Sequence, residues 1–381
     1  MHFNAIPGKE GIKNVLTRQA DQKRIPHAQL FLGSEGSGAL ALALAFSSYL
    51  VCTDKQNGES CGVCPSCNKS CKYIHPDIHF AFPVVKSDSK KREDTTSADF
   101  LPQWREILST NPYMGINQWL THIKAEKSQP NINVRECNEI IHKLNLMSYE
   151  SEFKILILWL PEYLGKEGNR LLKLIEEPPE NTIIILVAQQ QDMILSTILS
   201  RCQLVKINAF EDAEIIRYLE KSMSISGEKA VQIANLAEGN LNMAINLSKN
   251  EEADYSEMLL SWFRLCYAPD PLKLQEWINA FAQFSKDDQK SFLEYAIHFL
   301  RSFILMSLTD DQKIALTKNE KETAAKMKTV INVDKAETIS YLLNDAIRQI
   351  SGNANVKILM TADSLTIGDI MRSKAMATDR A

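Results

Sequence analysis

Four cysteines in the first part of the chain have the chemistry and the spacing of metal ligands. Successive members of the set are separated by eight, two and two residues: Cys52, Cys61, Cys64 and Cys67. Four thiolates bind zinc tetrahedrally and leave no open position, so we expect a structural zinc site in a module of residues 52–71. A tetrahedral set of four thiolates also suits iron, and Cys71 or His75 could replace one ligand.

The segment from Gly33 to Gly38 has the spacing of a loop that binds phosphate. It lies between an apolar run and an Ala/Leu-rich run, which is the strand–loop–helix context of a P-loop. A working P-loop continues with Lys and then Ser or Thr, which bind the phosphates and Mg²⁺. Here those positions hold Ala39 and Leu40, which offer neither a charge nor an oxygen. We therefore expect that the remnant binds no ATP, its residues being Gly33, Gly36, Gly38, Ala39 and Leu40; the alternative is an ordinary glycine turn.

The tripeptide Ser200-Arg201-Cys202 is a third candidate because of the cation at its centre. A guanidinium presents its donors in a planar fork that can bind two phosphate oxygens at once. Considered alone, however, an arginine at the end of a turn is most often a solvated surface side chain. The residues by themselves leave both interpretations open.

The pattern around these candidates predicts an α/β domain over residues 1–208. Continuous apolar or β-branched runs predict strands at residues 28–32, 78–85, 153–160, 182–188 and 203–207. Helical spacing predicts helices at residues 39–51 and 134–146, and a further helix that ends before Pro178. Because strands alternate with helices, the sheet should be parallel and should place the candidate loops at one edge.

Two regions of the chain depart from this alternation. Residues 86–130 form an insert that begins as a charged, serine-rich surface loop, and the sequence suggests no function for it. After residue 208 the periodicity is helical throughout. We expect a helical lid at residues 209–250 and an all-α domain at residues 251–381.

The composition excludes several classes of function. The 381 residues are 45% hydrophobic and 24% charged with a formal net charge of −4, so there is no overall basic field for nucleic acid. We find no export signal and no apolar run long enough to cross a membrane. We therefore expect a cytoplasmic protein whose eight cysteines are reduced or bound to metal.

Two further motifs accompany the three candidates. The pattern L-L-K-x-x-E-E-P-P begins at Leu171 and precedes Ser200-Arg201-Cys202, while His75-Pro76-Asp77 follows the cysteine module. With these motifs the chain resembles the AAA+ subunits of the bacterial DNA polymerase III clamp loader, over about residues 5–250. The resemblance implies an AAA+ P-loop-type α/β domain with an embedded zinc module, a helical lid and an all-α collar domain.

The resemblance also locates the residues that an active AAA+ ATPase requires. The strand-end acids that hold Mg²⁺ and orient water correspond to Leu158 and Trp159, and the lid arginine corresponds to Asn242. Glu162, the only acid near that strand end, is better explained as a carboxylate in the first turn of a helix. The nucleotide contacts are therefore replaced, while Arg201 is retained.

The resemblance accordingly implies a subunit that is no enzyme by itself but belongs to a DNA-directed DNA polymerase holoenzyme. It would supply Arg201 in trans, as an arginine finger, to a neighbouring ATPase. The implied partners are the tau/gamma ATPases and the delta subunit in a five-membered ring, the sliding clamp, and primed DNA reached through the complex. We expect structural Zn²⁺ in this chain, no ATP and no membrane.

Two other functions remain possible from the sequence. One is an active AAA+ ATPase of the tau/gamma type, against which Ala39 and Leu40 argue. The other is a zinc-dependent DNA-binding protein, against which the scattered lysines of residues 51–75 argue. Nucleotide binding by the chain would favour the first, and salt-sensitive DNA binding by the chain alone would favour the second.

Overall fold

The structure, a computed structural model, divides the chain into two compact units. It describes residues 1–86, 94–126, 128–249, 255–308, 324–325, 327–328, 330–352 and 354–373. The first unit comprises Met1–Tyr218 and Glu238–Asn242, and the second comprises Leu219–Ala237 and Met243–Ala381. The division falls within a helix of the expected lid, and the three-part division at residues 208 and 250 stays a prediction.

Five parallel strands form the sheet of the first unit, in the order β2-β3-β4-β1-β5. Their bounds are β1 (Ala28–Leu32), β2 (Ile78–Ala81), β3 (Lys154–Trp159), β4 (Thr182–Ala188) and β5 (Gln203–Lys206). Leu30 lies opposite Leu186, and Ile157 lies opposite Ile185. The carboxyl ends of β1, β3 and β4 therefore lie side by side, which is where open α/β sheets bind their ligands.

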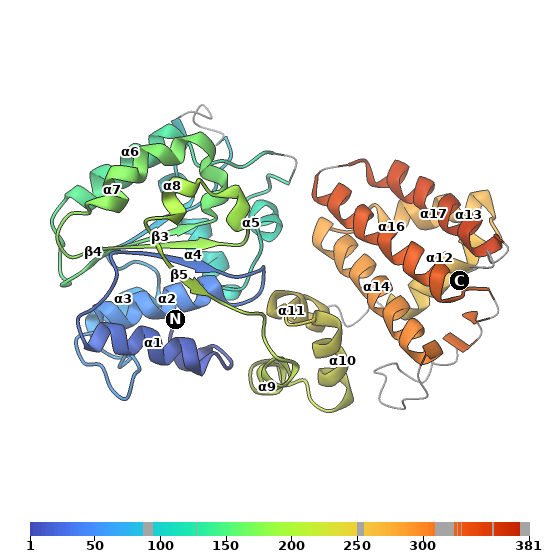
Figure 1. The fold of residues 1–381 in the computed structure, drawn as a ribbon, viewed down its shortest axis with the longest axis horizontal. Coiled ribbons are helices and arrows are strands. Elements are labelled where there is room, and N and C mark those ends of the chain that lie inside the picture. Colours follow the sequence, from blue (N-terminus) through green and yellow to red (C-terminus); the bar gives the residue numbers. More distant parts are fainter. Residues whose placement is uncertain are drawn as a thin grey trace, which may run out of the picture. The chain divides into compact units, whose positions relative to one another are not determined.

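Helices cover both faces of this sheet (Figure 1). One face carries α6 (Val134–Asn145), η4 (Pro161–Leu171), α7 (Leu172–Glu176) and α8 (Ser196–Leu199), and the other carries α1 (Glu10–Asp21), α2 (Ala39–Val51) and α3 (Pro65–Cys71). Short 3₁₀ turns lie at η1 (Phe3–Ala5), η3 (Ser97–Phe100) and η5 (Gln191–Met193). The expected α/β class with a parallel sheet is confirmed.

Three predicted elements have the bounds that the sequence pattern gives: 28–32, 39–51 and 182–188. All residues of α2 and β4 are buried, which explains why neither segment alternates between apolar and polar residues. The prediction for residues 78–85 is wrong in its second half, since β2 ends at Ala81. Pro83 has no N–H for a ladder, and its carbonyl instead accepts a 2.9 Å hydrogen bond from the Trp119 indole.

The insert packs against the end of the sheet instead of standing apart from it. Its helices are α4 (Leu101–Thr110) and α5 (Ile116–His122). Trp104 is fully buried, stacks on Phe82 with ring centroids 4.1 Å apart, and lies 5.1 Å from Trp159 at the end of β3. Such aromatic pairs contribute about 0.5–1.5 kcal/mol beyond their burial. Residues 87–93, in the predicted surface loop, lie outside the described residues.

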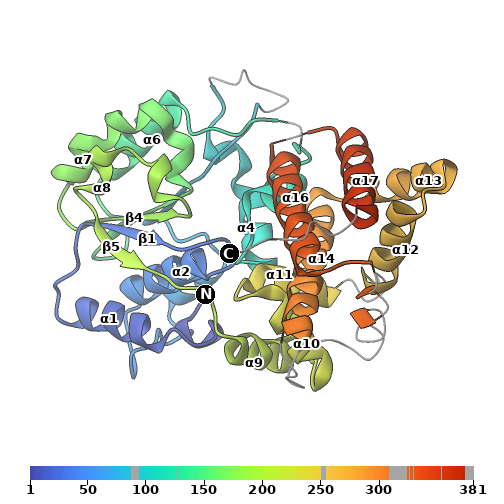
Figure 2. The same cartoon turned by 45° about the vertical axis from the view of Figure 1, so that its right-hand side comes forward.

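The second unit is helical throughout its described residues (Figure 2). Its helices are α10 (Glu228–Ala237), α12 (Tyr255–Tyr267), α13 (Pro271–Phe281), α14 (Lys286–Leu308), α16 (Val333–Ser351) and α17 (Val356–Arg372), with the end of α9 (Asp212–Met223) from Leu219 onward and most of α11 (Leu241–Lys249). Trp262 stacks on Trp277 at 5.2 Å in the core of this unit. Within the described part of the chain, no helix is both long and apolar enough to cross a membrane.

Candidate functional site

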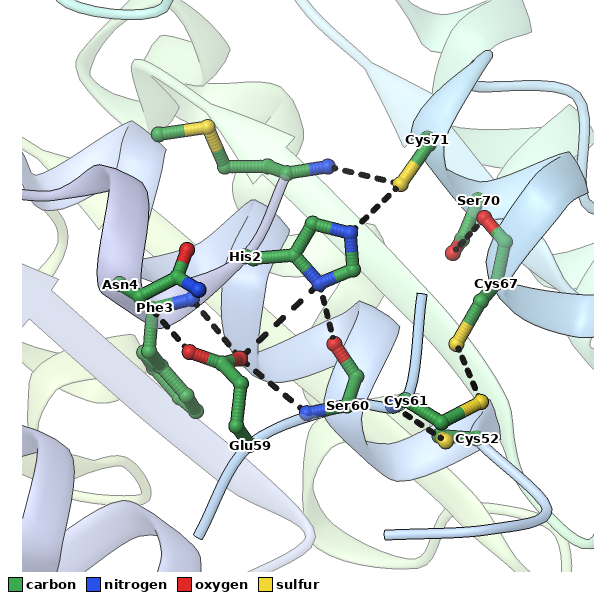
Figure 3. Close-up of polar contacts among 11 residues, drawn as sticks. His2, Phe3, Asn4, Cys52, Glu59, Ser60, Cys61, Cys67, Ser70 and Cys71 are labelled. Carbon is green, nitrogen blue, oxygen red and sulfur yellow. Dashed lines mark hydrogen bonds and ion pairs between the residues drawn. The ribbon is translucent and has the colours of Figure 1, made fainter. Parts of the chain in front are cut away.

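The four cysteines predicted as metal ligands converge in one cluster. Their sulfur atoms all lie within 4.8 Å of one another, and those of Cys61 and Cys67 are 3.9 Å apart (Figure 3). Zn–S bonds of about 2.3 Å in a tetrahedron place sulfurs about 3.8 Å apart, so the cluster has the dimensions of a four-thiolate site. Gly58 and Gly62, both with positive φ, supply the turns that bring the ligands together.

Main-chain N–H groups point at the sulfurs of this cluster. Cys61, Cys64 and Cys67 donate to the sulfurs of Cys52, Cys61 and Cys64 at 3.3, 3.4 and 3.4 Å. Burial opposes ionisation of Cys64, but hydrogen bonds from Thr53 and Cys67 outweigh it and lower its pKa to about 6. Burial raises the pKa of Cys52 and of Cys67. A bound cation would therefore be needed to hold all four residues as thiolates.

Cys71 and His75, the two alternative ligands, lie outside this set of sulfurs. Cys71 contacts the His2 ring at 3.2 Å, and the other nitrogen of that ring lies 2.7 Å from the Ser60 hydroxyl (Figure 3). His75 has a fully buried side chain that accepts a hydrogen bond from the Asp77 N–H, and it lies 3.2 Å from a Glu150 carboxylate oxygen. Among the described residues, the group of side chains that could hold a metal ion consists of the four predicted cysteines.

The His75-Pro76-Asp77 motif has a structural role next to the cysteine module. The Asp77 carboxylate accepts hydrogen bonds from the N–H groups of Tyr149, Glu150 and Ser151, at 2.5, 2.9 and 2.9 Å. Burial opposes ionisation, but these three donors outweigh it and lower the pKa of Asp77. The motif thus fixes the loop that leads into β3, and this loop contacts the module through an ion pair between Glu150 and Lys69.

The predicted P-loop remnant lies between β1 and α2, as the sequence pattern requires. Gly36 and Gly38 have φ of +72° and +90°, which glycine adopts without strain. A Cβ on Gly36 would lie 1.8 Å from the Asn240 side-chain oxygen, and one on Gly38 would lie 2.9 Å from the Phe210 ring. The mouth of the loop is therefore approached closely by the protein's own side chains. Ala39 and Leu40 are buried at the start of α2.

Asn242, which replaces the expected lid arginine, bonds to the loop. Its amide donates to the Glu35 carboxylate at 3.0 Å, and its oxygen accepts from the Asn111 amide at 2.7 Å. Asn111 and Asn242 are both buried, at 6% and 3% exposure. A Cβ on Gly115 would lie only 2.3 Å from the carboxyl carbon of Glu35, so the insert approaches this side chain closely. Asn242 thus bonds to the protein's own side chains on both sides of its amide.

Two cavities border the loop. The one lined by Gly33, Gly38, Tyr113 and Trp159 holds about 20 Å³, which is room for a water molecule, and the one lined by Gly33, Ser34, Gln189 and Lys206 holds about 650 Å³. Tyr113 comes from the insert and packs edge-on against Phe210, with ring centroids 6.1 Å apart. The insert therefore lines the smaller of the two cavities beside the loop.

The residues at the positions of the strand-end acids are part of the core. Leu158 and Trp159 are 0% and 2% exposed. Glu162 instead accepts hydrogen bonds from the N–H groups of Gln189 and Gln190 at the end of β4. Burial raises the pKa of Glu162, although the hydrogen bonds from these two N–H groups act in the opposite direction. Its contacts match the structural interpretation of this carboxylate and place it against main chain.

Arg201 follows α8 and is held at the surface of the first unit. Its Nε donates to the Glu176 carboxylate, and its Nη1 donates to the Thr197 carbonyl at 2.8 Å and to the Ser200 hydroxyl at 3.1 Å. Its side chain is 35% exposed. The arginine is therefore neither buried nor fully solvated, and it belongs to an ordered ion pair.

The two neighbours of Arg201 have different surroundings. The Ser200 hydroxyl donates to the Thr197 carbonyl at 3.2 Å and so helps to close the end of α8. Cys202 packs against the apolar core on the α6 face of the sheet, and burial raises its pKa to about 11. A thiol with this pKa is neutral at physiological pH, which makes Cys202 a packing residue in this chain.

Three residues of these sites have no signal in the sequence pattern. Glu35 and Asn111 meet Asn242 across separations of 207 and 131 residues. Glu176 lies in the E-E-P-P motif, but nothing in its spacing indicates Arg201 as its partner. A contact of this kind depends on how distant segments pack, which neither helical nor strand periodicity encodes.

These observations define the class of the protein. A parallel sheet with a P-loop position after its first strand, followed by helices, is the AAA+ P-loop-type α/β architecture that the motifs predicted. The model of the family described as "DNA polymerase III, delta subunit" matches residues 8–211, more than half of the chain. The chain belongs to this family, and the resemblance to clamp-loader subunits is confirmed.

Curated relatives of this chain are named as subunits of DNA polymerase III. The delta-prime subunit of Bacillus subtilis (strain 168) is 25% identical over 242 residues, 63% of this chain and 59% of that protein. The delta-prime subunit of Yersinia pestis is 25% identical over 288 residues, 74% of this chain and 70% of that protein. The tau subunit of Escherichia coli (strain K12) is 26% identical over 251 residues, 65% of this chain and 32% of that protein.

Solved structures give only weak likeness over the whole chain. A DNA polymerase III gamma-subunit-related protein of Thermotoga maritima covers 94% of this chain, at 14% identity and a TM-score of 0.38. The family assignment rests on the sequence match.

Proposed function

We propose that this chain is a non-catalytic subunit of a DNA polymerase III clamp loader, of the delta-prime type. It helps to load the sliding clamp onto primed DNA, and it supplies Arg201 to the ATP site of a neighbouring subunit. The observation that carries the proposal is the contrast between two places in the first unit. The P-loop remnant is closed by Glu35, Asn111 and Asn242, whereas Arg201 is ordered and accessible.

An arginine acting in trans needs no nucleotide in its own subunit. Its guanidinium stabilises the charge that develops on the transferred phosphoryl group, which is worth about 10³–10⁵ in kcat for GTPases. Lysine is a poorer substitute because it carries a point charge without the planar fork of donors. Retention of Arg201 beside a closed P-loop fits a subunit that completes a neighbour's site.

The four clustered cysteines would hold a structural Zn²⁺ in this chain. Bound zinc would supply the counter-charge of four clustered thiolates and would fix the fold of the module. The ligands are Cys52, Cys61, Cys64 and Cys67. A closed set of four ligands leaves no position for a reacting water, so the metal has no catalytic role.

The remaining parts of the proposal concern assembly. We place the chain in a five-membered ring with the tau/gamma ATPases and the delta subunit, with residues 251–381 as its part of the collar and residues 209–250 as a lid. Support comes from the family match and from delta-prime and tau relatives named as DNA polymerase III subunits. The helical character of the second unit is compatible with a collar.

The proposal is tested by the ATPase rate of a reconstituted loader in the presence of clamp and primed DNA. We expect Arg201→Ala to lower kcat at least tenfold, with Arg201→Lys recovering only part of the loss. Arg170→Ala is the matched control, because Arg170 is also an exposed arginine of the first unit in an ion pair, with Glu167 at 2.9 Å. Equal rates for wild type and Arg201→Ala would overturn the proposal.

A further inference from the structure

The guanidinium of Arg201 is held by three groups of the first unit. Glu176 is the last residue of α7, Thr197 belongs to α8, and Ser200 directly precedes the arginine. These groups bind Nε and Nη1. Within the described residues, Nη2 makes no hydrogen bond. Because the five donors of a guanidinium lie in one plane, fixing Nε and Nη1 also fixes the direction of the Nη2 donors.

The position of Glu176 follows from the sequence around it. Pro178 and Pro179 cannot continue a helix, so α7 ends at Glu176 and the chain turns towards β4. The next acid, Glu177, already has a non-helical backbone with φ of −128°. In the described structure Arg201 is paired with Glu176 and with no other acid. The E-E-P-P motif thus places one of its two carboxylates on the arginine.

We propose that Glu176 is a positioning residue for Arg201, holding its guanidinium so that the Nη2 donors face the phosphates of an ATP bound by the adjacent subunit. This inference rests on the proposed function. Without the carboxylate, Arg201 would sample several rotamers, and ordering it at the neighbour's site would carry an entropic cost. Glu176 binds Nε, and the Nη2 donor that points away from Nε is left for the phosphates.

The exposure of the two side chains limits how much their ion pair can contribute to the rate. The side chains of Arg201 and Glu176 are 35% and 43% exposed, so water screens their attraction. Exposed ion pairs contribute about 0.2–1 kcal/mol, and the upper value corresponds to about a fivefold change in rate. Loss of the positioning residue should therefore reduce turnover far less than loss of the finger itself.

The test is a double-mutant cycle on the clamp- and DNA-stimulated ATPase of the reconstituted loader. We expect Glu176→Ala to lower kcat about two- to fivefold with little change in KM for ATP, because the finger acts in the transition state. Glu176→Gln keeps an oxygen acceptor for Nε and should retain most of the rate. Glu177→Ala, which removes the adjacent acid, should match wild type. In the Arg201→Ala background, Glu176→Ala should have no further effect.

The outcomes distinguish failure of the arginine-finger function of Arg201 from failure of the positioning role of Glu176. If Arg201→Ala leaves turnover unchanged, the proposed function fails. If Arg201→Ala lowers turnover but Glu176→Ala matches wild type, or lowers it equally in both backgrounds, the arginine finger stands and the positioning role of Glu176 is overturned. Melting curves of the isolated variants identify any loss of folding, and an equal loss with Glu177→Ala would also contradict the proposal.

Discussion

The side-chain amide of Asn242 donates a 3.0 Å hydrogen bond to the carboxylate of Glu35, in the glycine loop that follows β1. In an active relative the resemblance places an arginine at the position of Asn242, where it would contact phosphate. Here an intramolecular bond takes the place of that contact. The Asn111 amide completes the arrangement by donating to Asn242 at 2.7 Å.

We predict that Asn242→Ala destabilises the first unit by about 1–3 kcal/mol, because it leaves the buried Asn111 amide without this acceptor and Glu35 without its donor. Urea unfolding followed by tryptophan fluorescence measures this change. Asn145→Ala is the matched control, since the Asn145 side chain is exposed and bonds only within its own helix turn. Equal loss in the two variants would show that the Asn242 contacts contribute nothing special.

We predict that the isolated chain binds no nucleotide. A site filled to 100 times its Kd would stabilise the folded state by about 2.7 kcal/mol, which raises the melting temperature measurably. Because Ala39, Leu40 and Asn242 offer no charge for phosphate, millimolar Mg·ATP should leave the melting curve unchanged. A tau/gamma subunit treated in the same way serves as the positive control. A clear upward shift for this chain would show that the loop opens to nucleotide.

We predict one equivalent of tightly bound zinc per chain, measured by elemental analysis after dialysis. Cys61→Ser should lose the metal and lower the melting temperature, because three thiolates and a hydroxyl no longer form the closed set. Cys71→Ser is the control and should keep the metal, since Cys71 contacts His2 and lies outside the set. Metal loss in both variants, or in neither, would contradict this ligand assignment.

Asp77 should make stability depend on pH in the acid range. Its pKa is lower in the folded state than the ordinary value of 3.8, so its contribution is complete above that value and is lost as pH falls below it. Wild type should exceed Asp77→Asn in unfolding free energy by about 1–3 kcal/mol at pH 6, and the difference should shrink below pH 4. The exposed Asp192→Asn variant should show no such trend. A difference that stays constant with pH would rule out the carboxylate charge as its source.

The sequence predicted the central sheet well because its elements are short, uniform and bounded by glycine or proline. The runs at residues 28–32 and 182–188 are buried on both faces and therefore read as continuous apolar strands. The four cysteines were also predictable, since ligand spacing is a local property. In residues 78–85 the apolar run extends beyond the strand, because Pro83 cannot donate to a ladder and β2 ends at Ala81.

The closure of the glycine loop could not be read from the sequence. The losses of Lys at position 39 and of the lid arginine at position 242 were visible residue by residue. What replaces them was not, because Asn111 comes from an insert with no recognisable motif. The ion pair of Arg201 with Glu176 was also hidden. Both residues lie in recognised motifs, but their spacing does not show that the two segments pack together.

The proposed role of Arg201 at the ATP site of a neighbouring subunit can be seen directly in a cryo-EM structure of the assembled loader on clamp and primed DNA, trapped with ADP and aluminium fluoride. We predict an Nη atom of Arg201 within about 3 Å of the phosphate analogue in the adjacent site, and no nucleotide in the glycine loop of this chain. An Arg201 that faces solvent away from every nucleotide, or a nucleotide seated on Gly33–Gly38, would contradict it.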